Sequence, residues 1–202
     1  LAPLALQGAI ADKDAVIVRS ATHVDAAAVA AGTKLKLVVR AGIGVDNIDV
    51  AACAKNGIVV ENTPQGNAIS AAEHALALLF SLARQIPLAN VVTKAGTWEK
   101  KRFSGVQLHG KTIGIVGVGN IGREVAIRAT SLGMSVLGCD PLLSGGMASE
   151  LGIVKVEKDE LLARSDVITF HSPLVVATRG WLGVADLART KRGVLIVNAA
   201  RG

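Results

Sequence analysis

The sequence feature that most restricts the fold is a glycine-rich turn between an apolar run and a helix-like run. Residues 111–116 read as a β-strand, and residues 117–122 (GVGNIG) follow at once. In this spacing Gly117 allows a tight turn, Gly119 lets the backbone approach a pyrophosphate, and Gly122 lets the helix pack on the strand. The free N–H groups at the start of the helix can then bind phosphates. The motif therefore predicts a dinucleotide site on a parallel sheet.

An acidic residue stands where a dinucleotide site needs one. A second predicted strand ends at Cys139, and Asp140 follows it, eighteen residues after Gly122. A carboxylate there would accept hydrogen bonds from the ribose hydroxyls. It would also repel a 2′-phosphate, by about 4 kcal/mol for unit charges 4 Å apart at an effective dielectric near 20. We therefore expect NAD rather than NADP, with Asn120 and Ile121 also contacting the cofactor. The alternative is that Asp140 only begins a turn with the proline that follows it.

The order of apolar runs predicts the fold class. Short β-branched runs alternate with Ala/Leu-rich runs along the whole chain, which is typical of an α/β fold with a parallel sheet flanked by helices. The strands are nearly continuously apolar, so we expect burial on both faces of the sheet. The expected strands are residues 14–18, 35–39, 58–61, 112–116, 135–139, 153–156, 166–170 and 193–198.

A long helix is predicted between the third and fourth of these strands. It begins near Asn67, and Ser70 and Glu73 have the spacing of a capping box. Residues 71–83 are apolar nearly all round, so the helix should be buried on every side. We expect it to connect a first domain, residues 1–66, to a second domain, residues 67–202.

Composition excludes several classes of protein. Half of the 202 residues are hydrophobic, which is incompatible with a disordered chain, and no apolar run reaches the ~18 to 20 residues that span a bilayer. Cys53 and Cys139 lack CxxC spacing, so we expect no disulfide and no metal site, and a reducing cytoplasm fits best. The net charge of +6 fits nucleic acid or anionic metabolites. Three Phe, two Trp and no Tyr disfavour nucleic acid, and we expect no membrane partner.

One phosphate-binding pattern occurs in the wrong context. Residues 105–112 (GVQLHGKT) match GxxxxGK[ST], the P-loop pattern. A P-loop follows a strand and opens a helix, whereas this segment leads into a strand. We therefore do not expect a nucleoside triphosphatase, and Lys111 is interpreted as a solvated residue before the strand.

Six ordered segments together resemble the D-isomer-specific 2-hydroxyacid dehydrogenases over essentially the whole chain. They are residues 18–22 (VRSAT), 40–49 (RAGIGVDNID), 62–67 (NTPQGN), 117–122 (GVGNIG), 171–173 (HSP) and 197–202 (VNAARG). The resemblance implies a smaller, flavodoxin-like substrate domain followed by a Rossmann domain, both incomplete here, with the active site between them.

The resemblance also implies which residues face the substrate. Backbone N–H groups of Gly42, Ile43 and Gly44 would hold the substrate carboxylate. Arg19, Ser20 and Asn67 would line the substrate side, and such a basic, donor-rich wall would favour a substrate phosphate.

The cofactor and catalytic residues are implied in the same way. His171, Ser172 and Pro173 would form the wall beside the adenosine, and Ala199 would contact the cofactor. Arg201 would be the family's catalytic arginine. Arginine suits this role because a guanidinium binds a carboxylate bidentately and stays charged when partly buried. His171 is not assigned as the base. The family's acid–base histidine and the carboxylate that orients it would lie beyond Gly202, so we expect a chain truncated at both ends.

The implied reaction moves a hydride from the C2 hydroxyl of a small anionic 2-hydroxy acid to NAD. We favour 3-phospho-D-glycerate as the substrate. The alternatives are a related enzyme acting on glyoxylate, hydroxypyruvate, glycerate or lactate, and a regulator that binds NAD without catalysis. A homodimer or homotetramer is the expected assembly.

Overall fold

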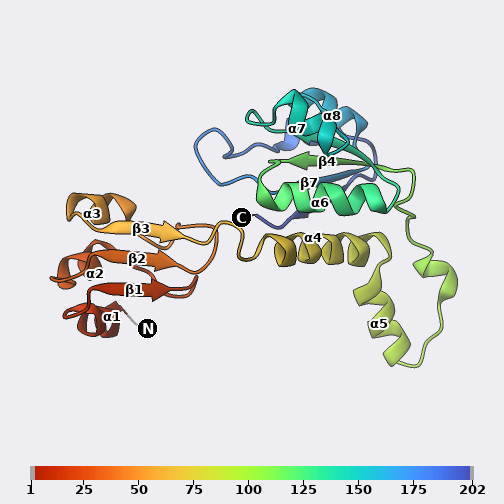
Figure 1. Ribbon diagram of the computed structural model, residues 1–202. Coiled ribbons are helices and arrows are strands. Elements are labelled where there is room, and N and C mark those ends of the chain that lie inside the picture. Colours follow the sequence, from red (N-terminus) through yellow and green to blue (C-terminus); the bar gives the residue numbers. More distant parts are fainter. Residues whose placement is uncertain (1–2, 201–202) are drawn as a thin grey trace. The chain divides into compact units, whose positions relative to one another are not determined.

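The chain folds into two compact α/β units. A computed structural model describes residues 3–200 (Figure 1). The units comprise Leu1–Ala68 and Ile69–Gly202, so they divide two residues after the boundary expected from the sequence. Each unit contains one parallel sheet with helices. The predicted α/β class is therefore confirmed.

Unit 1 is built on a three-stranded parallel sheet with the order β1-β2-β3. Two of its helices begin at aspartate N-caps: Asp25 and Asp49 accept hydrogen bonds from the backbone N–H groups of Ala28 and Ala52, each at 2.8 Å. Such caps satisfy N–H groups that the first turn leaves free. The elements are α1 (Pro3–Ile10), β1 (Ala15–Val18), α2 (Ala26–Ala31), β2 (Leu37–Arg40), α3 (Val50–Lys55) and β3 (Val59–Asn62).

The unit 1 sheet is buried on one face, and the expectation of burial on both faces is wrong here. Val18 and Val38 lie in the hydrophobic core that this unit forms by itself. Ile17 and Val59, whose side chains alternate to the other face, are 72% and 55% exposed. Continuous apolar runs therefore overestimated burial, because within the described chain nothing covers the second face.

Unit 2 is built on a five-stranded parallel sheet with the order β6-β5-β4-β7-β8. The chain leaves β4 toward one edge and returns to the other side of β4 with β7, so the topological switch point lies beside β4. The strands are β4 (Thr112–Val116), β5 (Ser135–Cys139), β6 (Ile153–Lys155), β7 (Val167–Phe170) and β8 (Leu195–Asn198).

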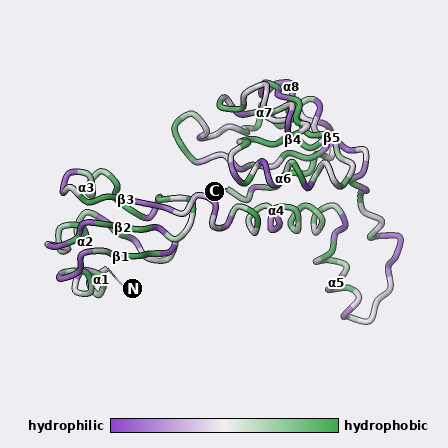
Figure 2. Tube along the Cα trace, viewed as in Figure 1, coloured by the Kyte–Doolittle hydropathy of each residue, from purple (hydrophilic) through white to green (hydrophobic). Residues whose placement is uncertain are grey.

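Helices cover both faces of the unit 2 sheet. One apolar cluster joins α4 and α6 to the sheet, and a second joins it to α8. Consistent with this, residues 113–116 of β4 are all buried, and hydrophobic residues dominate the strand in Figure 2. The helices are α4 (Ala68–Ala83), α5 (Ile86–Lys94), the 3-10 turn η1 (Lys100–Phe103), α6 (Asn120–Ser131), α7 (Gly145–Glu150), α8 (Lys158–Arg164) and α9 (Val184–Leu187).

Helix α4 has a buried face and an exposed face, so the expectation that it is buried on every side is wrong. Residues Ala72, Ala75, Leu76, Leu79 and Ala83 belong to the unit 2 core. On either side of this buried stripe the helix exposes large apolar side chains, Ile69 and Phe80 on one side and Leu78 and Leu82 on the other. The helix begins at Ala68, so Ser70 lies inside its first turn rather than at the N-cap.

No single helix in residues 3–200 is long and apolar enough to cross a membrane. Helices α4 and α5 pass such a test only as a pair, bent by 60° at the break between them, and by length and composition alone. A core helix passes the same test, and α4 contributes five residues to the core of unit 2.

Candidate cofactor and substrate site

The predicted cofactor residues gather at the carboxyl edge of the unit 2 sheet. Val116 at the end of β4 is in register with Cys139 of β5 and Phe170 of β7, and Phe170 is in register with Asn198 of β8. The segments that follow these strands therefore lie side by side. Ligands of open α/β sheets bind outside this edge, at the switch point. The segments contain Gly117, Gly119, Asn120, Ile121, Gly122, Asp140, His171, Ser172, Pro173 and Ala199.

The three motif glycines of residues 117–122, here named the phosphate cradle, have different surroundings. Gly117 has φ +88°, and a Cβ there would lie 2.6 Å from the backbone nitrogen of Ser172. A Cβ on Gly122 would collide with the carbonyl oxygen of Gly117. At Gly119 a Cβ would meet nothing within 4 Å. The protein's own packing thus requires the first and third glycines, whereas the second faces open space.

That open space adjoins an uncapped helix. Gly119 is the N-cap of α6 and makes no side-chain cap, and Asn120 opens the first turn. The first N–H groups of a helix have no partner within the helix and carry the positive end of its dipole. The cradle can therefore accept an anionic group at Gly119 without displacing a protein side chain.

Asp140 is held directly against the cradle. Its Oδ2 accepts a hydrogen bond from the backbone N–H of Val118 at 2.7 Å, and its Oδ1 accepts one from Leu142 N–H at 2.7 Å. The carboxylate therefore begins a turn with the residues that follow it, which was the alternative role expected for Asp140. It also holds the cradle in place through Val118. Each carboxylate oxygen has two acceptor positions, so both can still bind a ribose hydroxyl.

His171 is a half-buried side chain beside the cradle. Its backbone N–H donates to Val116 O at 2.8 Å, and its Nε2 lies 2.9 Å from Thr169 Oγ1. Burial lowers the pKa of His171 to about 4. Its Nδ1 is buried and has no partner among the described residues. A histidine that stays unprotonated near neutral pH is suited to the predicted wall beside the adenosine of the cofactor.

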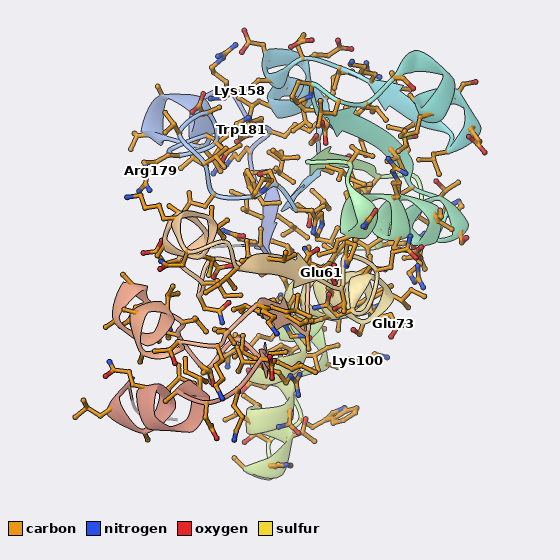
Figure 3. The ribbon with its side chains drawn as sticks, turned by 60° about the vertical axis from the view of Figure 1, so that its left-hand side comes forward. Glu61, Glu73, Lys100, Lys158, Arg179 and Trp181 are labelled. Carbon is orange, nitrogen blue, oxygen red and sulfur yellow. The ribbon has the colours of Figure 1, made fainter. Side chains whose placement is uncertain are left out.

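A cavity of about 280 Å³ adjoins the His171–Pro173 segment within unit 2. Trp181 forms one wall, packing edge-on against Phe170 with ring centroids 5.5 Å apart. Lys158 Nζ lies 5.0 Å from the Trp181 ring centroid (Figure 3) and pairs with Asp186 at 2.8 Å. Sequence reasoning did not single out these side chains, because they meet only through the fold. The lining residues are Phe170, Ser172, Pro173, Leu174, Thr178, Gly180, Trp181, Leu182, Ile196, Asn198 and Ala200.

The predicted substrate residues gather at the carboxyl edge of the unit 1 sheet. Val18, Arg40 and Asn62 end the three strands in register. Arg19 and Ser20 follow β1 and are exposed. The segment of Gly42, Ile43 and Gly44 follows β2, and Asn67 lies beyond the end of β3.

A buried arginine that sequence reasoning missed supports this edge. Arg40 is 9% exposed, and its Nε donates to Asn47 Oδ1 at 3.3 Å. Asn47 Nδ2 in turn donates to the carbonyl oxygens of Arg19 (3.1 Å) and Thr22 (2.6 Å). Gly42 has φ +154°, and a side chain there would collide with the Arg40 guanidinium. A charged residue at the end of an apolar strand was the signal that could have identified Arg40.

The 42–44 loop is also tied to the strand on its other side. Thr63 N–H donates to Gly42 O at 3.0 Å, and Asn62 Nδ2 donates to Ile43 O at 2.7 Å. These bonds consume carbonyl oxygens and hold the loop in place. Arg201, the predicted catalytic residue, lies outside the described residues 3–200, so its role stays a prediction.

Comparison with known proteins agrees with these features. The family model described as "D-isomer specific 2-hydroxyacid dehydrogenase, NAD binding domain" matches residues 76–202, which is more than half of the chain. The chain belongs to the D-isomer-specific 2-hydroxyacid dehydrogenases. Residues 76–202 are thus an NAD-binding domain of this family, and the family and cofactor expected from the sequence are confirmed.

Individual relatives and solved structures show which members of the family the chain is similar to. The chain is 50% identical to D-3-phosphoglycerate dehydrogenase of Archaeoglobus fulgidus over 94% of its own length and 36% of that protein. Among solved structures, the TT0316 protein of Thermus thermophilus matches all of the chain and 65% of that structure, with TM-score 0.90 and 30% identity. D-lactate dehydrogenase of Aquifex aeolicus, solved with NAD and lactic acid, has TM-score 0.85 and 29% identity over 97% of the chain and 59% of that structure. The chain therefore spans about a third of the length of the curated relative.

The residues of unit 2 fit NAD. The open side of Gly119 adjoins the uncapped start of α6, and the Asp140 carboxylate lies beside it. The Nδ1 of His171, which has no partner within residues 3–200, provides a further buried polar atom at the same edge. An anion cradle next to a hydroxyl acceptor is the donor and acceptor set that a dinucleotide requires.

Proposed function

We propose that this chain is part of an enzyme that oxidises the C2 hydroxyl of 3-phospho-D-glycerate with NAD, giving 3-phosphohydroxypyruvate. The observation that carries this proposal is the 50% identity to a D-3-phosphoglycerate dehydrogenase over nearly the whole chain. A sister dehydrogenase for lactate is less well supported, because the identity to the D-lactate enzyme is 29%.

In this proposal unit 2 binds and orients the cofactor. The phosphate cradle takes the pyrophosphate, Asp140 accepts from the ribose hydroxyls, and His171, Ser172 and Pro173 form the wall beside the adenosine. Ala199, directly after β8, extends the contact along the same edge. Bound NAD supplies an acceptor for the hydride. His171 stays neutral, so it packs against the cofactor without bringing a charge.

Unit 1 binds the acidic substrate. Backbone N–H groups of the 42–44 loop hold the carboxylate, and the buried Arg40 beneath Gly42 adds positive charge behind them. Arg19, Ser20 and Asn67 supply exposed donors for the phosphate. Arg201 aligns the carboxylate and polarises the oxygen at C2, as the family resemblance implies.

A homo-oligomer is part of the same proposal. On α4 the exposed Leu78 and Leu82 are four positions apart and therefore lie on one side of the helix, and α5 exposes Leu88 and Val91. Large apolar groups gathered on neighbouring helices are typical of an interaction surface. A second copy of the chain is the partner that we propose.

Substrate class is tested by ligand binding to the purified chain in the presence of NADH. We expect 3-phospho-D-glycerate to bind at least tenfold more tightly than D-glycerate or D-lactate, because a charge-assisted hydrogen bond contributes roughly 1.5 to 3 kcal/mol. Arg19→Gln should remove most of this preference. Calorimetric titration of the three acids measures it.

The matched control is Lys36→Gln. Lys36 is also an exposed cation of unit 1, but it pairs with Asp14 before the strands begin, at the opposite edge of the sheet. The Lys36→Gln variant should keep the preference of the unaltered chain for 3-phospho-D-glycerate. Equal affinities of the unaltered chain for 3-phospho-D-glycerate and D-glycerate would refute the assignment of a phosphorylated substrate and leave the NAD site untouched.

A further inference from the structure

The phosphate cradle contains no basic residue, but an arginine folds back onto it. Residues 117–122 have the sequence GVGNIG, and Arg123 follows directly, in the first turns of α6. Its Nε donates a hydrogen bond to the carbonyl oxygen of Val118 at 3.3 Å. The guanidinium is therefore held beside the cradle rather than extended into water.

Arg123 is a half-buried cation without a carboxylate partner in the part of the chain that the structure describes. Arg128, further along α6 and also half-buried, pairs with Glu124 at 2.5 Å. Withdrawing a charge from water is costly unless an opposite charge or hydrogen bonds compensate. The bond to Val118 uses one of the five N–H donors of the guanidinium. The other donors remain available to an anion.

The two backbone polar groups of Val118 hold a carboxylate and a guanidinium at the cradle. The Val118 N–H donates to Asp140, and the Val118 carbonyl accepts from Arg123. Val118 lies between Gly117 and Gly119, and Gly119 faces open space. A dinucleotide carries two negative charges on its pyrophosphate and neutral hydroxyls on its ribose. A guanidinium suits the first and a carboxylate suits the second.

We propose that Arg123 is the cofactor-positioning cation of this site, binding the pyrophosphate of NAD while Asp140 recognises the ribose. This assignment rests on unit 2 being an NAD-binding domain and is independent of the substrate that we propose. Asn120, which opens α6, is neutral, so Arg123 provides the positive charge that the cradle itself lacks.

The test compares three ligands and three variants of the full 202-residue chain. NADH binding is followed by its fluorescence, and ADP-ribose and adenosine are measured by competition with NADH. Arg123→Gln should weaken NADH and ADP-ribose about tenfold, the effect of one lost charge-assisted bond. Adenosine has no phosphate, so its affinity should change less than about twofold. Arg123→Lys should retain most of the affinity for NADH, because it keeps the charge.

Arg128→Gln is the matched control, since it removes an arginine of the same helix that is already paired. All three affinities should stay unchanged in this variant. Arg123→Gln should also flatten the dependence of NADH affinity on salt, because one fewer charge is screened. Thermal unfolding of each variant confirms that the domain remains folded.

Two results would overturn the assignment of Arg123. One is equal NADH affinity of Arg123→Gln and the unaltered chain. The other is a parallel loss for NADH, ADP-ribose and adenosine, which would show that Arg123 only supports the shape of the cradle. If the unaltered chain bound none of the ligands, the NAD site itself would be refuted, and the proposal with it.

Discussion

His171 shows how burial alone sets the chemistry of a residue. Within residues 3–200 its imidazole has one hydrogen-bond partner, Thr169, and no acidic side chain there holds a proton on it. Desolvation disfavours the charged form, so the pKa falls to about 4. A histidine at the end of a strand is a candidate base by sequence alone. Here it instead contributes an uncharged surface beside the cradle.

This burial predicts a pH dependence of stability. The pKa of His171 is 6.5 in the unfolded chain and about 4 in the folded chain. Between these two pH values the unfolded chain therefore binds one more proton than the folded chain. The contribution of neutral His171 to the free energy of unfolding is fully present above about pH 6.5. It is lost as the pH falls toward 4, and the total loss is on the order of 3 kcal/mol. His171→Gln should flatten this part of the curve. Urea unfolding of unit 2 from pH 7 to pH 4.5 measures it.

A suitable comparison is His74→Gln, at an exposed histidine of the same unit. It should preserve the pH dependence of the unaltered chain. An unchanged slope in His171→Gln would show that His171 is already solvated in the folded protein.

At the scale of elements, α4 and α5 differ in how they use apolar residues. Helix α4 buries one face in the core of unit 2, whereas α5 has no buried residue. On α5, Leu88 and Val91 are three positions apart and therefore lie on one face, 56% and 64% exposed. Such a helix gains little from folding alone and is stabilised when another surface covers it.

This arrangement predicts association that one charge can disrupt. We expect the chain to be dimeric or larger, and Val91→Glu to raise the dissociation constant at least tenfold, because a buried unpaired carboxylate is costly. Sedimentation at several concentrations measures the change. Ile127→Glu, on an exposed position of α6, should leave the assembly intact. A monomeric unaltered chain, or an unchanged mass in Val91→Glu, would contradict the proposed interface.

At the scale of the whole molecule, each unit has its own hydrophobic core. Unit 1 packs around Val24 and Val38, and unit 2 around clusters on both faces of its sheet. The two sets of predicted site residues also divide between the units. Cofactor and substrate residues therefore belong to bodies that each have the means to fold.

The division predicts selective stabilisation by the cofactor. NADH at one hundred times its Kd should stabilise unit 2 by about 2.7 kcal/mol, raising its unfolding midpoint by roughly 10 °C. The transition of unit 1 should not move, since its residues contribute the substrate side. Differential scanning calorimetry with and without NADH resolves the two. A single transition that shifts as a whole would show that the units unfold together.

The family followed from the resemblance of six motifs and is confirmed. The class of fold and the glycine-rich turn of residues 117–122 could be predicted from the residues themselves. These depend on local physics: strands β4 and β5 lie where their apolar runs predict, and the turn at Gly117 needs a conformation that glycine adopts freely. Which polar groups meet depends on the tertiary structure. Asn47 reaches Arg19 and Thr22, and Asp140 reaches Val118, only because separate strands end at one edge. The exposed face of α4 and the neutral state of His171 depend on the tertiary structure as well, since burial depends on neighbours far along the chain.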